Sequence, residues 1–274
     1  MTIKQLIVGV MLSTMIFAPQ SMSAQKQFTL EDLNYGGNNF HNMVPKNRYT
    51  AWWGDQLVRT DAEFCALIDK NTGKETRLFN LDDVNQWVES AGNIKVRSFY
   101  HATFPYPNQP LVLLNASKTR MLVNWKTKQL VWKQDTKDES FADWNDQSRA
   151  VAFVKGENLY VCNAQGTHKQ LTKDGSRDIV YGQSVHRDEF GIYKGTFWSN
   201  DGQKLAFYRM DQSMVADYPL VDIDTRIATE TPVRYPMAGE KSHLVTVGIY
   251  DLKTDKTVYL NTGDPTDRYF TNIA

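Results

Sequence analysis

The segment His186–Gly191 (HRDEFG) holds the residues best suited to chemistry, because it places two neighbouring carboxylates, Asp188 and Glu189, beside the aromatic Phe190. If both carboxylates face one cavity, they repel each other, and each becomes costly to ionise without a positive partner. A ligand ammonium could be that partner through charge-assisted hydrogen bonds. An α-amino group, with a pKa of about 7.7–8.0, is mostly charged at neutral pH. The alternative is a solvated loop in which Arg187 neutralises one of the acids.

Other catalytic signatures are incomplete. Residues 182–186 (GQSVH) begin like a G-x-S-x-G nucleophile elbow, but the final glycine is absent and no helical pattern follows. The five histidines lack metal-ligand spacing, and the two cysteines form no C-x-x-C pair. The sequence therefore predicts no serine nucleophile, no metal and no cofactor. The long insertion at 210–239 is either a functional element or a loop without a role.

Repeated sequence segments indicate the strands and turns that must position the acidic pair. Trp144 and Trp198 are 54 positions apart, as are Phe153 and Phe207, and each copy is typical of a strand end, a polar turn and a buried strand. A second element, strand–turn–strand with Asn, Gly or Asp in the turn, recurs at 66–79, 121–130, 159–172 and 248–260.

Aromatic-marked units of short strands are typical of a β-propeller, with a β-sandwich as the alternative fold. We therefore expect an all-β chain forming a partial β-propeller of roughly three to four blades, each a four-stranded antiparallel sheet. Residues 269–274 resemble the start of a further unit, so the chain is expected to end before the ring closes.

Composition narrows the class of protein. The 274 residues include 31 basic and 31 acidic side chains, and this balance disfavours a nucleic-acid partner. Residues 1–24 combine Lys4, an apolar run at 6–18 and small residues up to Ala24, the pattern of a signal peptide. That run is shorter than the roughly 20 residues of a stable membrane span. We expect an exported protein, periplasmic or secreted, whose propeller portion is 25–274; an uncleaved N-terminal anchor is the alternative.

Cys65 and Cys162 lie in separate strand-like runs of different repeat units. Export would permit a disulfide between them. The prediction favoured by their context is two buried small hydrophobic residues.

Residues 178–260 resemble the N-terminal propeller of the dipeptidyl peptidase IV family, prolyl-oligopeptidase-type serine peptidases, of the bacterial exported type. The matching features follow in order: Asp178-Ile179-Val180-Tyr181 before the acidic pair, 198–202 (WSNDG) like the family's W-S-P-x-G, the strand 205–211, and 234–239 (RYPMAG) like its Y-P-x-A-G. Residues 45–177 are compatible with the family and carry weaker motifs.

The resemblance implies a cavity shared by an eight-bladed propeller and an α/β-hydrolase domain. The family's acidic pair, usually Glu-Glu, grips the substrate's N-terminal ammonium and so fixes cleavage two residues in, usually after Pro or Ala. Asp188 and Glu189 resemble that pair, and Glu189 is the closer match because its arm has the same length. The family also uses a propeller arginine against the substrate's backbone carbonyl, for which Arg120 is a candidate and Arg97 another.

The family's Ser, Asp and His belong to a C-terminal hydrolase domain that this sequence lacks, so these residues alone cannot perform acyl transfer. We therefore expect the substrate-gating and N-terminus-recognition portion of a proline-specific dipeptidyl aminopeptidase. Its expected partners are the peptide N-terminus, the hydrolase domain and a second copy in the full-length enzyme. The alternative is a non-catalytic periplasmic propeller that binds peptide or protein.

Overall fold

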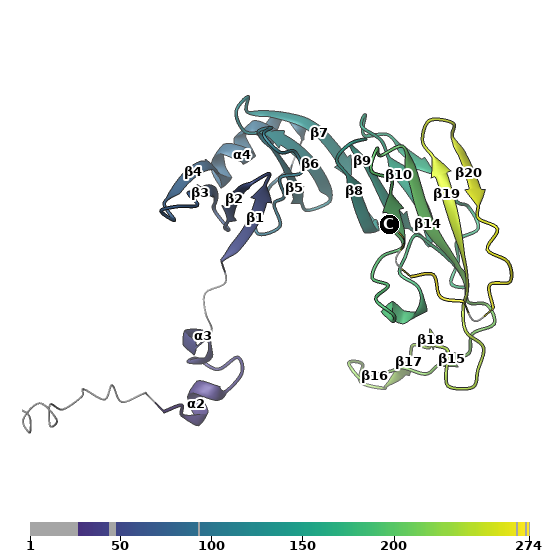
Figure 1. Ribbon diagram of the computed structural model, residues 1–274. Coiled ribbons are helices and arrows are strands. Elements are labelled where there is room, and N and C mark those ends of the chain that lie inside the picture. Colours follow the sequence, from purple (N-terminus) through teal and green to yellow (C-terminus); the bar gives the residue numbers. More distant parts are fainter. Residues whose placement is uncertain (1–26, 44–47, 93, 267, 272, 274) are drawn as a thin grey trace, which may run out of the picture. The chain divides into compact units, whose positions relative to one another are not determined.

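The computed structural model describes residues 27–43, 48–92, 94–266, 268–271 and 273 (Figure 1). The predicted signal peptide, 1–24, lies outside the described residues. The chain divides into two compact units, residues 1–47 and 48–274. The described part of the first unit contains two short helices, α2 (Leu30–Leu33) and α3 (Phe40–Met43). A capping box starts α2, in which Thr29 and Asp32 each accept the other's backbone amide.

The second unit is built from antiparallel β-sheets (Figure 1). The first sheet runs β1 (Tyr49–Trp53), β2 (Gln56–Thr60), β3 (Phe64–Ile68) and β4 (Glu75–Asn80). The second contains β5 (Leu111–Ala116), β6 (Thr119–Asn124) and β7 (Gln129–Asp135). The third contains β8 (Ser140–Asn145), β9 (Ala150–Lys155), β10 (Asn158–Cys162) and β11 (His168–Gln170).

The fourth sheet has the order β12-β14-β19-β20, with β13 also paired to β14. Its strands are β12 (Ile179–Tyr181), β13 (Thr196–Trp198), β14 (Lys204–Asp211), β19 (Leu244–Asp251) and β20 (Lys256–Tyr259). The predicted insertion leaves this sheet after β14 as an arm of two short ladders, β15 (Asp217–Tyr218) with β18 (Val233–Arg234) and β16 (Val221–Asp222) with β17 (Thr229–Glu230). The all-β prediction with four-stranded antiparallel sheets is therefore confirmed, although the second sheet has three strands and the fourth has five.

None of the three α-helices in the described residues, α2, α3 and α4 (Leu81–Val88), was predicted. Helix α4, followed by the 3₁₀ turn η1 (Glu89–Ala91), packs Val84 and Val88 into the core beside the first sheet. Its capping box, in which Asn80 and Asp83 accept each other's backbone amides, is the sequence signal that marks its start. Within the described ranges, no helix is both long enough and apolar enough to cross a bilayer.

The four predicted strand–turn–strand segments are confirmed as the antiparallel pairs β3/β4, β6/β7, β10/β11 and β19/β20. In each turn, one Asp or Asn side-chain oxygen accepts backbone amides two to four residues further along the chain. The acceptors are Asp69, Asn124, Asn163 and Asp251. Such turns satisfy the backbone locally, which is why these residue types recur at the same place.

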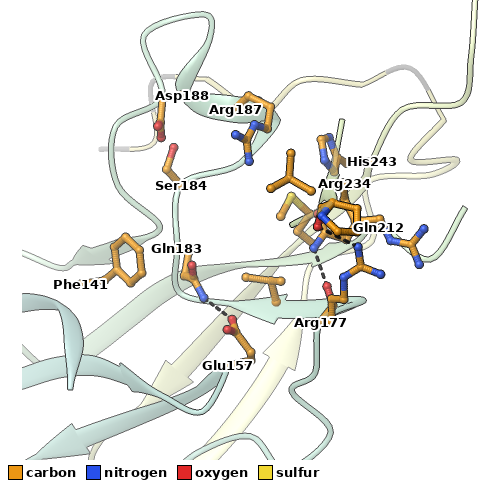
Figure 2. Close-up of a pocket in the computed structure, with 14 residues that line it drawn as sticks. Phe141, Glu157, Arg177, Gln183, Ser184, Arg187, Asp188, Gln212, Arg234 and His243 are labelled. Atoms are coloured by element: carbon orange, nitrogen blue, oxygen red, sulfur yellow. Dashed lines mark hydrogen bonds between the residues drawn. The ribbon is translucent and has the colours of Figure 1, made fainter. Parts of the chain in front are cut away.

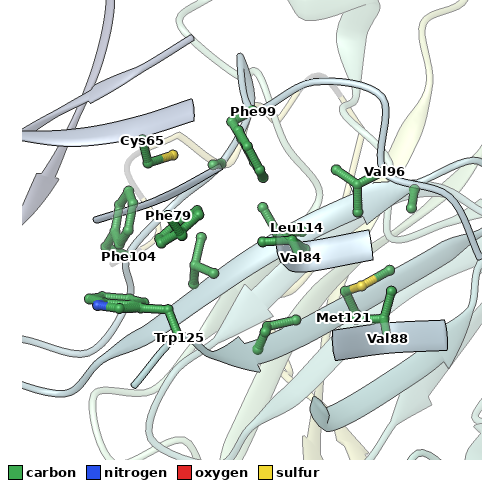
Figure 3. Packing of buried hydrophobic residues seen from close by; sticks show 14 of the residues in the cluster. Cys65, Phe79, Val84, Val88, Val96, Phe99, Phe104, Leu114, Met121 and Trp125 are labelled. Atoms are coloured by element: carbon green, nitrogen blue, oxygen red, sulfur yellow. The ribbon is translucent and has the colours of Figure 1, made fainter. Parts of the chain in front are cut away.

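Consecutive sheets are joined by buried apolar side chains and by indole hydrogen bonds. Figure 3 shows the cluster between the first two sheets, which contains Phe79, Met121 and Trp125. The Trp132 Nε1 of the second sheet donates to the Asn163 carbonyl at 3.1 Å, next to β10 of the third sheet. The Trp198 Nε1 of the fourth sheet donates to the Asp143 carbonyl of the third, also at 3.1 Å. Trp132 and Trp198 therefore each mark a contact between neighbouring sheets.

The two cysteines are free and buried, in separate clusters. Cys65 belongs to the core of the first two sheets, and Cys162 to that of the second and third. Burial raises the pKa of the Cys162 thiol to about 12, so it stays protonated and behaves as a small apolar side chain. The structure confirms the prediction of two buried hydrophobic residues.

Candidate functional site

The acidic pair lies on the loop between β12 and β13, where the backbone turns in an unusual direction. His186, Arg187 and Asp188 have φ of 52°, 59° and 63°, and form the short turn η2 (His186–Asp188). Side chains other than glycine adopt this left-handed region at a cost of about 1–3 kcal/mol each, so the surrounding structure must hold the turn in place.

Buried neighbours on both sides anchor the turn. Val185 and Ile192 flank it and pack into the core of the fourth sheet. The Ser184 hydroxyl donates to the Ile192 carbonyl at 2.7 Å, and the Ile192 amide donates to the Glu189 carbonyl at 3.1 Å. Residues 187–190 are therefore presented outward on a loop whose two ends are fixed.

The two carboxylates face different cavities. Asp188 lines a cavity of about 410 Å³ (Figure 2), whereas Glu189 lines a second cavity of about 280 Å³. Both side chains are exposed, and within the described residues neither forms an ion pair with Arg187 or any other cation. Arg187 borders both cavities. The structure thus leaves both acids available to a ligand but does not direct them to one point.

The walls of the larger cavity are largely satisfied by one another (Figure 2). The Gln183 Nε2 donates to the Glu157 carboxylate at 2.6 Å. Arg177 pairs with Asp217 at 2.5 Å, and the Gln212 Nε2 donates to the Arg177 carbonyl. The Gln183 bond connects the loop to the third sheet, and the Arg177 contacts connect the segment before β12 to the arm and to the end of β14. Arg187, Asp188 and His243 line the same cavity.

The smaller cavity combines two carboxylates with aromatic rings. Glu189 and Glu240 line it together with Phe190, Tyr235 and Tyr269. Glu240 was not among the site residues predicted from the sequence. Its signal is its position directly after the RYPMAG segment: the Glu240 amide donates to the Met237 carbonyl at 2.9 Å, across a turn whose Gly239 has φ of 82°.

Two buried histidines meet at the left-handed turn: His186, which is its first residue, and His243. The rings of His186 and His243 are 5.5 Å apart, and none of their nitrogens has a hydrogen-bond partner within the described residues. Burial and the neighbouring His243 lower the pKa of His186 to about 4. Burial and Arg187 lower the pKa of His243 as well. Both rings are therefore neutral at pH 7.

Arg120, the candidate for binding the substrate's backbone carbonyl, lines neither of these two cavities. Its guanidinium pairs with the Glu139 carboxylate at 2.8 Å and donates to the Gln134 Oε1 at 2.8 Å. The Gln134 Nε2 in turn donates to Glu139 at 2.7 Å. The side chains of Arg120 and Glu139 are only 12% and 5% exposed. The structure thus places Arg120 in a buried network of β6, β7 and the turn before β8, and Arg97 at an exposed position.

Removing Arg120 should destabilise the fold. The Arg120→Ala variant leaves the Glu139 carboxylate buried without its cation, which costs about 3 kcal/mol or more of unfolding free energy. Lys155→Ala, which removes an exposed pair with Asp138 at 4.0 Å, should cost less than about 1 kcal/mol. Urea denaturation measures both variants. Equal stabilities for Arg120→Ala and the wild type would contradict this description of the network.

The loop should require a glycine at position 195, because the backbone of Gln183 packs closely against it. A Cβ at this position would overlap the backbone of Gln183, so Gly195→Ala should lose about 2–3 kcal/mol of unfolding free energy. Gly191→Ala is the matched control, because its Cβ would meet open space and only its φ of 74° is strained, at about 1 kcal/mol. Urea denaturation measures both variants. If Gly195→Ala and Gly191→Ala lose the same unfolding free energy, the predicted overlap with Gln183 is wrong.

Acid should destabilise the loop through His186. Its pKa of about 4 in the folded state lies below the ordinary 6.5, so the unfolded chain binds more protons between these values. Stability from this group is complete above pH 6.5 and declines toward pH 4, by at most about 1.4 kcal/mol per pH unit. His243, whose pKa is lowered as well, contributes in the same direction. Arg187, Glu189 and Glu240 are the charged groups that line the same cavity as His186. Unfolding measured against pH should show a shallower acid slope for His186→Gln; identical slopes would refute the effect.

Comparisons with known proteins identify the family of this chain. Residues 113–274, more than half of the chain, match the family model described as the dipeptidyl peptidase IV (DPP IV) N-terminal region. A solved structure of a putative dipeptidyl aminopeptidase IV from Bacteroides ovatus is 41% identical with a TM-score of 0.77, covering 91% of this chain and 34% of that one. Porphyromonas gingivalis dipeptidyl peptidase 4 shares the fold at 19% identity, with a TM-score of 0.61 over 86% of this chain and 35% of that one.

A curated relative from Emericella nidulans, a probable dipeptidyl-aminopeptidase B, is 29% identical over 286 aligned residues, which cover 89% of this chain and 30% of the relative. The chain thus spans about a third of the length of these proteins. It belongs to the dipeptidyl peptidase IV family and corresponds to that family's N-terminal region.

Proposed function

We propose that this chain is the part of a dipeptidyl aminopeptidase that recognises the free N-terminus of a peptide substrate. In this proposal the four sheets are consecutive blades of a β-propeller. The sequential order of the sheets, their antiparallel strands and the indole bonds between neighbouring sheets support it. Because the chain spans about a third of its relatives, the nucleophile and its base are contributed by residues outside this sequence.

The observation that carries the proposal is the state of Glu189. Its carboxylate is exposed at a cavity, has no cation partner within the described residues, and sits on a loop anchored at both ends. An α-ammonium held there forms charge-assisted hydrogen bonds, which are about twice as strong as neutral ones.

Fixing the ammonium also fixes the register of the substrate. The scissile bond then lies at a set distance, two residues into the peptide, and the binding energy orients its carbonyl toward the distant nucleophile. The proposed products are N-terminal X-Pro and X-Ala dipeptides. Asp188, which lines the neighbouring cavity, adds negative charge near the entrance.

Two further points belong to this proposal. The leader-like residues 1–24 support export to the periplasm or the exterior. A second copy of the full-length enzyme remains a proposed partner.

Neutralising Glu189 should impair recognition without unfolding the protein. In the full-length enzyme that carries this region, Glu189→Gln should lower kcat/KM for glycyl-prolyl-p-nitroanilide by about 30-fold or more, which corresponds to about 2 kcal/mol. The melting temperature should stay within about 1 °C, since an exposed side chain is changed. Glu230→Gln, an equally exposed change on the arm, serves as the matched control. Unchanged kcat/KM in Glu189→Gln would overturn the proposal.

A further inference from the structure

The cavity of about 280 Å³ that Glu189 lines contains a second carboxylate from a distant segment, Glu240. Within the described residues, neither acid forms an ion pair. Arg187 is the cation that also lines this cavity, so the three groups together have one net negative charge. Such a balance attracts a single positive ligand group.

Aromatic rings line the same cavity. Phe190 and Tyr269 have ring centroids 4.8 Å apart, and Tyr235 lines it as well. The three rings are 61%, 43% and 37% exposed. The Tyr208 hydroxyl donates to the Phe270 carbonyl at 2.5 Å, which ties the segment carrying Tyr269 to the fourth sheet. Aromatic faces attract organic cations through their quadrupole, so the rings complement the two acids.

A buried polar side chain without a partner lines this cavity too. His186 is only 4% exposed, and neither of its ring nitrogens has a hydrogen-bond partner within the described residues. Its ring packs against that of Tyr269 in a tilted arrangement, with the ring centroids 4.3 Å apart. A buried polar group without a partner is uncommon in folded proteins, and a ligand that bonds to it is one explanation. A neutral imidazole offers one acceptor nitrogen, which suits an N–H donor.

We propose that this cavity is the ammonium-binding pocket, with Glu240 as the second carboxylate beside Glu189 and His186 as a further acceptor. The inference rests on the proposed function and specifies its site: the two acids that hold the substrate's primary ammonium come from two segments of the chain. Asp188, although adjacent to Glu189 in sequence, faces the other cavity and is not one of them. The three N–H donors of an ammonium match the three acceptors of the pocket.

The test is the binding of glycyl-proline, a dipeptide with a free ammonium, to the full-length enzyme by isothermal titration calorimetry. N-acetyl-glycyl-proline, which lacks the charge, is the ligand control. The variants are Glu189→Gln, Glu240→Gln and Asp188→Asn, with Glu230→Gln as an exposed control on the arm. Glu240 is exposed on a turn, so its substitution should leave the melting temperature unchanged.

We expect Glu240→Gln and Glu189→Gln each to raise the Kd of glycyl-proline about tenfold or more, because each removes a charge-assisted bond. Asp188→Asn should change it less than about threefold, and Glu230→Gln should leave it as in the wild type. If Glu189→Gln weakens binding while Glu240→Gln does not, or if Asp188→Asn has the larger effect, the inference is wrong and the proposed function stands. If neither glutamate variant weakens binding, both fail.

Discussion

The left-handed turn at His186–Asp188 is the constraint on which the site depends. Three successive residues with positive φ reverse the direction in which neighbouring side chains point. As a result His186 goes into the interior, whereas Asp188 and Glu189 emerge at two different cavities. Such a turn is costly for residues with a Cβ, so it persists only because its flanks are fixed in the core of the fourth sheet. The position of the carboxylates is thus a property of the whole sheet.

The sheets that fix these flanks are stabilised by a few recurring interactions. Asx turns close the hairpins, and indole hydrogen bonds connect neighbouring sheets across their apolar clusters. The arm that interrupts the fourth sheet is tied back by Arg234, whose guanidinium pairs with Asp178 at 2.8 Å. That pair places the following turn, and therefore Glu240, on the side of the loop that carries Glu189. The insertion, which interrupts the repeated pattern of strands, thus contributes residues to the cavity that Glu189 lines.

Much of the fold could be predicted from sequence because its signals are local. Asn, Asp and Gly mark the hairpin turns, and Trp144 and Trp198 mark equivalent strands. Helix α4 was missed, since eight residues are too few for a clear helical period, although its capping box is visible at Asn80. The site was predictable only in part. Residue type made Glu189 a candidate, but the side to which each carboxylate points depends on φ, and the presence of Glu189 and Glu240 in one cavity depends on tertiary structure.

The most direct measurement is a crystal structure of the full-length protein that carries this region, with glycyl-proline bound. The account predicts that the ligand's ammonium nitrogen lies within hydrogen-bonding distance of the carboxylates of both Glu189 and Glu240, next to the rings of Phe190 and Tyr269. An ammonium placed between Asp188 and Glu189, with Glu240 left in solvent, would contradict the two-segment pocket. An ammonium bound away from Glu189 altogether would contradict the account as a whole.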